Sequence, residues 1–191
     1  MPAIAPSDPR ALIEAQRGIS RLVERDLRAA FRTLPIQDAG TTRDAMLHIT
    51  EQVVNRYGEI GANFAADWYD SARIAKRAPR RWTAAPLVAD RREAVIETVR
   101  RVAGDLFTDH PETMIDRLVP HAQQYALASM RTTITSNADH DRSARGWVRV
   151  TNPGACDYCI DLANEDTVWS SEDGADFEAH TGCNCTAAPA F

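Results

Sequence analysis

The cysteines of this 191-residue chain gather at its C-terminal end, with a spacing that suits a metal ion. They form two pairs, Cys156-Asp-Tyr-Cys159 and Cys183-Asn-Cys185, and His180 precedes the second pair. Thiolate and imidazole are the ligands that zinc prefers, and two such ligand groups separated by a short gap are typical of a structural zinc site. We therefore predict one structural zinc ion, with candidate ligands Cys156, Cys159, His180, Cys183 and Cys185.

Tetrahedral zinc takes four ligands, so one of the five candidates is spare. The Cys-x2-Cys spacing makes Cys156 and Cys159 the safest ligands, and we expect His180 to bind while Cys183 or Cys185 is displaced. A catalytic zinc would need an open position and a general base, which favours a structural ion here. Unmetallated core cysteines and a pair of disulfides are the alternatives. Because residues 1–9 do not form a secretory signal, an oxidising destination is not expected, and metal is favoured over disulfides.

The composition describes a chain that can fold and that is not basic overall. It is 44% hydrophobic and 26% charged, with a formal net charge of -5. This negative net charge does not indicate a protein that binds nucleic acid over its whole surface, although arginines cluster at residues 73–81. Such a cluster is more often solvated helix surface than a contact with an acidic partner or DNA. No apolar run approaches the roughly 20 residues of a membrane span, so no membrane partner is expected.

Helical periodicity dominates the first two thirds of the chain. Asp8 followed by Pro9 predicts a helix start, and apolar residues recur at helical spacing up to Phe31. A second, longer stripe opens near Thr41, with Gly58 and Gly61 marking close helix packing or a bend. An apolar stripe at such spacing is a core face or a face for a partner helix. Its residues here are Met46, Ile49, Val53, Tyr57, Ile60, Phe64 and Trp68.

Two further helices complete the predicted body. One begins at Asp90, and another begins at Pro111, in which Pro120 predicts a kink or a split. We expect a loop over residues 137–145, then strands over residues 146–151 and 167–170. The fold class is therefore mostly α, with a long-helix body over residues 8–136 and a small α+β, loop-rich zinc-binding module over residues 146–191.

The segment over residues 149–191 resembles the C-terminal end of phage minor head proteins of the Mu F-like head morphogenesis group. In that group a strand leads into a Cys-x-x-Cys…Leu knuckle, then a variable stretch and a His-x-x-Cys-x-Cys motif with a brief apolar end. Here these are Cys156-Asp-Tyr-Cys159-Ile-Asp-Leu162 and His180-Thr-Gly-Cys183-Asn-Cys185. The group more commonly has Pro-Asn in place of Thr181-Gly182 and Arg in place of Asn184. The chain is most similar to the short type from actinobacteriophages, often labelled capsid maturation protease.

This resemblance implies a minor protein of the phage head that acts in head morphogenesis. Such a protein is expected in the head interior of the virion, near the portal vertex, and in the host cytoplasm during assembly. Its expected partners are the portal and the major capsid or scaffold proteins, with packaged DNA as a further candidate.

Two other functions are weighed against this one. A capsid maturation protease needs a nucleophile beside a base, for which Ser129, His140 and Ser143 are candidates without a supporting motif. The helical body and the lack of a hydrolase signature favour a protein that is not an enzyme. Without a metal, His180 and Cys183 would become a candidate catalytic pair. The third possibility is a cellular zinc-ribbon-type interaction module, against whose nucleic-acid-binding form the acidic net charge argues.

Overall fold

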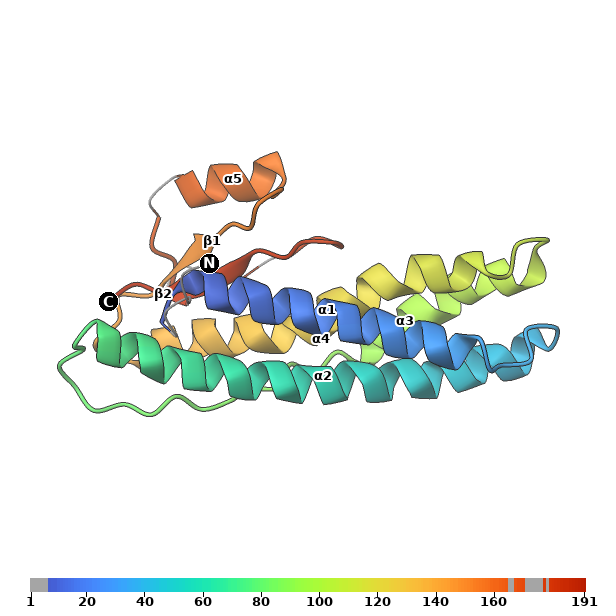
Figure 1. Ribbon diagram of the computed structural model, residues 1–191, viewed down its shortest axis with the longest axis horizontal. Coiled ribbons are helices and arrows are strands. Elements are labelled where there is room, and N and C mark those ends of the chain that lie inside the picture. Colours follow the sequence, from blue (N-terminus) through green and yellow to red (C-terminus); the bar gives the residue numbers. More distant parts are fainter. Residues whose placement is uncertain (1–6, 165–166, 171–176, 178) are drawn as a thin grey trace, which may run out of the picture.

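Long helices lie side by side and give the molecule its elongated shape (Figure 1). The computed structural model describes residues 7–164, 167–170, 177 and 179–191. Its elements in chain order are α1 (Pro9–Phe31), α2 (Ala39–Ala75), α3 (Arg92–Val102), the 3-10 turn η1 (Ala103–Phe107), α4 (Thr113–His140), β1 (Trp147–Val150), α5 (Asp157–Asn164) and β2 (Thr186–Pro189). The prediction of a mostly helical chain is confirmed. Within the described residues, no helix is long and apolar enough to cross a membrane.

The first helix begins where the sequence predicts it. The Asp8 carboxylate accepts a hydrogen bond from the Arg10 backbone N–H at 2.9 Å, and Pro9 occupies the first helical position. Both features fit a helix N-terminus, where the first N–H groups lack partners inside the helix. The buried face of α1 consists of Leu12, Ile13, Gln16, Ile19, Val23, Leu27 and Phe31.

The buried face of α2 coincides only in part with the predicted apolar stripe. Ile60 and Phe64, which belong to the predicted apolar stripe, are 48% and 38% exposed. The helix instead turns its small residues inward, with Gly58, Gly61 and Ala65 buried. Met46, Tyr57 and Trp68 of the same stripe are buried, so only part of the stripe belongs to the core face.

The close approach of α4 explains why α2 buries small residues. A Cβ atom added at Gly61 would lie 2.7 Å from the Met130 Cγ atom, and one added at Gly58 would lie 2.9 Å from the Ser129 Oγ atom. Larger residues at these two positions would push the helices apart, and the contacts between them would be lost. The predicted close packing at the two glycines is confirmed.

Helix α4 is continuous through Pro120 and longer than expected. Proline removes one N–H donor, but the helix is not split at this position. The loop expected from residue 137 starts later, because Asn137 and Ala138 are buried and the helix runs to His140. The division into units at residues 136 and 146 stays a prediction.

A connector over residues 77–91 links α2 to α3, and its extended part lies beside α4. An extended chain has no internal partners for its backbone N–H and C=O groups. A polar ladder on α4, formed by Ser129, Thr133 and Asn137, supplies these partners. Its side chains accept hydrogen bonds from the N–H groups of residues 89, 87 and 85 at 3.1, 3.0 and 3.0 Å. Four helical residues rise about 6 Å and two extended residues about 6.6 Å, so the two spacings match.

The C-terminal segment forms a two-stranded antiparallel sheet next to the helices. Strand β1 pairs with β2 from Trp147 opposite Pro189 to Val150 opposite Thr186. The predicted first strand is thus confirmed, whereas the second is reduced to a single bridge between Trp169 and Trp147. Strand β2 and helix α5 were not predicted from the sequence.

Candidate metal centre

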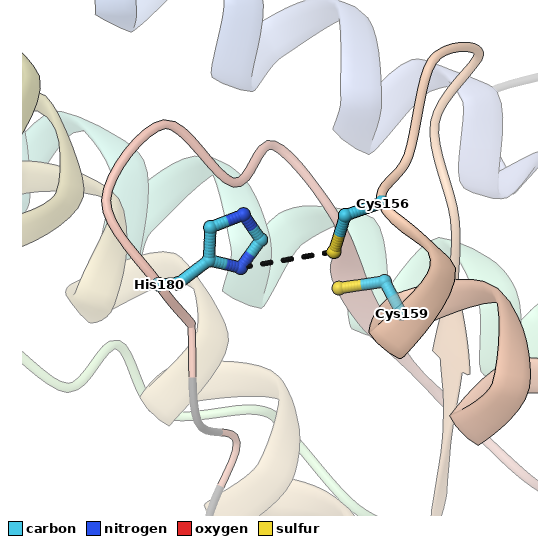
Figure 2. Close-up of side chains that lie close together, drawn as sticks. All are labelled: Cys156, Cys159 and His180. Carbon is cyan, nitrogen blue, oxygen red and sulfur yellow. Dashed lines mark hydrogen bonds between the residues drawn. The ribbon is translucent and has the colours of Figure 1, made fainter.

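The five predicted ligands come together from two segments that are separated in the sequence. Cys156 precedes α5 and Cys159 lies in its first turn, whereas His180, Cys183 and Cys185 lie in the chain that leads into β2. Figure 2 shows Cys156, Cys159 and His180 with their ligand atoms directed toward one another. The pairing of β1 with β2 brings the two segments side by side, because each segment adjoins one of these strands.

The ligand atoms form two overlapping groups of three that share Cys159. One group is Cys156, Cys159 and His180, and the other is Cys159, Cys183 and Cys185; within each group the atoms lie within 4.8 Å of one another. The Cys156 Sγ and His180 Nδ1 atoms are 3.9 Å apart, and the Cys159 and Cys183 Sγ atoms are 3.7 Å apart. Either group could hold a metal ion.

Burial differs across the cluster. Cys159, Cys183 and Cys185 are buried, Cys156 is half-buried and His180 is exposed. All four cysteines are free thiols. The sulfur-rich side of the cluster is therefore shielded from water, while the imidazole stands at its rim.

Arg131 of α4 anchors the second half of the cluster to the helices. Its side chain is 3% exposed, and its Nε and Nη2 atoms donate to the backbone carbonyls of Cys185 and Cys183 at 3.1 and 2.6 Å. Burial lowers the pKa of Arg131 to about 10, while the neighbouring thiols act in the opposite direction, so the guanidinium keeps its charge at neutral pH. Arg131 thus places a buried positive charge next to the thiols.

A second arginine approaches the cluster from β1. The Arg149 Nη1 atom lies 3.6 Å from the Cys159 Sγ atom and donates toward it. The guanidinium of Arg149 also stacks over the Phe177 ring at 4.0 Å, and that of Arg131 lies 5.3 Å from the same ring. Both buried guanidinium groups therefore form cation–π contacts with the same ring.

The thiols titrate as a coupled group. Hydrogen bonding from Cys185 lowers the pKa of Cys183 to about 5, and the charge of Arg131 acts in the same direction. The same hydrogen bond, together with burial, raises the pKa of Cys185. Burial raises the pKa of Cys159 to about 11. One thiolate is thus favoured at Cys183, and metal binding requires thiolates.

Further contacts hold the His180 loop against α4 and α1. The Gln124 amide donates to the Ala179 carbonyl, and the Thr181 hydroxyl donates to the Gln124 Oε1 atom at 3.1 Å. The Ser20 hydroxyl of α1 lies 3.5 Å from the Asn184 Oδ1 atom. The loop that carries the second half of the cluster is therefore built onto the helices.

The three protease candidates are not brought together as a catalytic pair within the described residues. The Ser129 hydroxyl is 1% exposed and accepts from Ala89 N–H in the polar ladder. The His140 ring is hydrogen-bonded to the Ser136 carbonyl, and the Ser143 Oγ atom is buried without a hydrogen-bond partner.

Sequence reasoning missed the two arginines that face the cluster. Arg131 occupies a helix position between the buried residues Leu127 and Ile134, where a charge is unexpected. Arg149 occupies the inward register of β1 together with Trp147. A charge on a predicted buried face is the signal that could have marked both residues.

The comparisons with known proteins found one family. A family model described as VG15 protein matches residues 3–191 of the chain. The search of the curated proteins and the search of the solved structures each found no match.

Proposed function

This chain belongs to the VG15 protein family, a viral-gene family, and on that premise we propose that this phage protein is a minor head component that acts in head morphogenesis. The proposal also uses the resemblance of its tail to the Mu F-like head morphogenesis group. In this proposal it lies in the head interior near the portal, and its partners are the portal and the major capsid or scaffold proteins.

One observation carries the structural side of this proposal, namely the Cys/His cluster that joins the tail to the helices. We propose that the cluster holds one structural zinc ion. Neighbouring sulfur atoms of a tetrahedral zinc site are about 3.8 Å apart, and a sulfur and a nitrogen about 3.6 Å apart, from the usual bond lengths. The distances of 3.7 Å between Cys159 and Cys183 and of 3.9 Å between Cys156 and His180 are close to these values.

A zinc ion here would link two short segments that have little apolar surface of their own. The segment with α5 and the segment that leads into β2 would share one ion, and Arg131 would tie it to α4. Small modules gain much of their stability from such an ion. The long helices α1 and α2 would supply surfaces for contacts with partner proteins during assembly.

Metal content tests the zinc proposal directly. Protein purified without chelator should contain about one zinc per chain by elemental mass spectrometry. Because Cys159 belongs to both groups of three, the C159S variant should lose the ion whichever group binds. The H180A, C183A and C185A variants then identify the spare ligand, because a variant that keeps its full metal content has lost a residue that does not bind the ion. A C159S protein with unchanged zinc content would refute the proposed site.

Its place in the particle is tested independently of the metal. Phage heads purified away from tails and free protein should contain the chain at low copy number by quantitative mass spectrometry. Cross-linking in assembling heads should join it to the portal or to the major capsid or scaffold protein. A protein that stays in the soluble lysate and is absent from procapsids and mature heads would contradict the assignment.

A further inference from the structure

A basic cavity lies at the end of the molecule where α2 passes into the extended connector. It has a volume of about 330 Å³, and its charged and polar lining consists of Arg73, Arg77, Arg80, Arg81, Trp82 and Thr83. The chain as a whole carries a formal net charge of -5, whereas the local charge at this cavity is positive. Local concentrations of one sign of charge in a concave site attract ligands of the opposite sign.

Most of these arginines are not needed to balance the protein's own acids. Arg73 is buried, forms an ion pair with Asp141 and donates to the Arg80 carbonyl, so it acts as the floor of the cavity. Arg77, Arg80 and Arg81 are exposed, and none of the ion pairs in the described part of the chain involves them. Three guanidinium groups are therefore available to a ligand.

The backbone at Arg77 gives a second, independent indication. Its φ angle is 53°, in the left-handed region, and it directly follows Lys76, the residue that caps the C-terminus of α2. The Ala78 N–H bonds to the Arg73 carbonyl and the Arg77 N–H to the Ile74 carbonyl, both at 3.1 Å, as in a helix end that favours glycine. An arginine at this position costs stability relative to glycine, and such strain concentrates at functional sites.

The helix dipole explains only part of the cluster. Cations in the last turn of a helix interact favourably with its negative end, which accounts for Arg73 and Lys76. Arg80 and Arg81 lie beyond the helix in the connector, where this effect has fallen off. Their presence beside Arg77 calls for a different reason.

We propose that this cavity binds the phosphate groups of a DNA backbone, without regard to base sequence. The planar fork of arginine matches the oxygens of a phosphate, and several arginines in one cavity can contact adjacent phosphates. Trp82 is held in place as its indole N–H donates to the Asn137 Oδ1 atom at 3.2 Å, which leaves a rigid apolar wall for sugar or base. This site goes beyond the proposed function, although packaged DNA would be its ligand inside a head.

Fluorescence anisotropy with a labelled DNA duplex of about 20 base pairs tests the site. We expect binding at about 50 mM salt that weakens steeply toward about 200 mM. The double variant R80Q/R81Q should bind about tenfold more weakly at low salt, and the slope of log affinity against log salt should fall by about 2. The matched control R17Q/R21Q removes the same charge from exposed positions of α1 and should bind almost as well as the wild type.

The R77G variant separates binding from folding. Glycine suits the left-handed backbone at this position, so the melting temperature should equal or exceed that of the wild type. Its DNA affinity should nevertheless fall, with a slope lower by about 1. Inorganic phosphate and polyglutamate are the comparison ligands.

Several outcomes would overturn the proposal. These are no duplex binding at about 50 mM salt, equal losses in R80Q/R81Q and the control, or an arginine-dependent site that takes polyglutamate or inorganic phosphate but not DNA. A protein that binds DNA as expected yet is absent from phage heads would contradict only the proposed function.

Discussion

At the scale of single residues, Arg131 links the helices to the candidate metal centre. Its guanidinium is buried and donates to the carbonyls of Cys183 and Cys185. A buried cation is costly unless a nearby negative charge compensates for it. Among the described residues, the cysteine thiols are the groups that raise its pKa against the effect of burial. Arg131 is therefore expected to position the second ligand pair and to favour its thiolate form.

Replacing Arg131 by methionine should weaken metal binding about 10- to 100-fold, the usual effect of losing a group that orients metal ligands. The change keeps most of the buried volume but removes the charge and both hydrogen bonds to the Cys183 and Cys185 carbonyls. Competition against a chromophoric chelator measures the affinity for zinc. R131K, which keeps the charge, should lie between R131M and the wild type. R100M changes an exposed arginine and should leave the affinity unchanged; equal affinities in all the variants would exclude this role of Arg131.

At the scale of the elements, the packing of α2 against α4 depends on the size of single residues. Gly58 and Gly61 allow the two helices to approach closely, and the larger residues Ile60 and Phe64 turn outward as a result. Hydrophobic spacing alone does not distinguish these two faces, because both carry apolar residues. The face that α2 buries is decided by the space between α2 and α4, and that space depends on the position of α4.

The variant G61V should lower the free energy of unfolding by about 1–3 kcal/mol, since overpacking displaces neighbours that cannot retreat without loss of contact. The new side chain would meet Met130 and Ile19, which lie 2.7 and 3.3 Å from the added Cβ position. Gly18 of α1 is the matched control, with no atom within 4 Å of its added Cβ. G18A should raise stability by about 0.5–1 kcal/mol through its better helix propensity. Urea unfolding measures both, and a G61V protein as stable as the wild type would show that the helices can separate freely.

The polar ladder on α4 decides how the connector lies. Asn137 accepts from the Ala85 N–H and the Trp82 indole N–H, and it donates to the Ala85 carbonyl at 2.8 Å. The Asn137 side chain therefore forms hydrogen bonds with several polar groups of the extended segment.

Replacing Asn137 by alanine should release part of this connector and destabilise the fold by about 1–3 kcal/mol, because buried partners lose their hydrogen bonds. Trypsin should then cut faster after Arg80 and Arg81, which lie in the connector. Time courses followed by mass spectrometry measure the cleavage rates. S136A changes the preceding, half-buried residue and should leave the rates unchanged. Unaltered cleavage in N137A would mean that the ladder does not hold the connector.

At the scale of the whole molecule, the C-terminal segment contacts the helices both at the cysteine cluster and at the chain end. The cluster meets α4 through Arg131, and the terminal Phe191 ring packs edge-on against Tyr69 of α2 with centroids 5.7 Å apart. Arg73 lies over the same Phe191 ring at 5.9 Å and forms the ion pair with Asp141. The helices share one core with the two strands, which contribute Trp147, Ala187 and Ala188, whereas the buried cysteines form a separate cluster.

Removing the metal with a chelator should therefore loosen the tail and leave the helices folded. Hydrogen–deuterium exchange should increase over residues 151–164 and 179–185, which lie outside the main core, because metal binding supplies much of the stability of such segments. Exchange in α1 and α2 should stay slow, since their buried faces pack against α4. Equal loss of protection in all helices would show that the ion holds the entire fold.

Local patterns along the chain predict the long helices and the residues of the metal cluster. Periodic apolar residues and the Asp8-Pro9 cap are local signals, so α1 was predicted well. The Cys/His spacing likewise named all five residues of the cluster before their positions were known. Local chemistry suffices here because capping and ligand type depend on neighbours in the chain.

The surfaces that meet depend instead on how the elements are arranged in three dimensions. The inward face of α2, the two arginines beside the sulfur atoms, strand β2 and the ladder under the connector all depend on residues far apart in the sequence. The order of the two ligand groups around Cys159 also depends on the pairing of β1 with β2. Such contacts follow from distances between elements, and a one-dimensional pattern does not contain those distances.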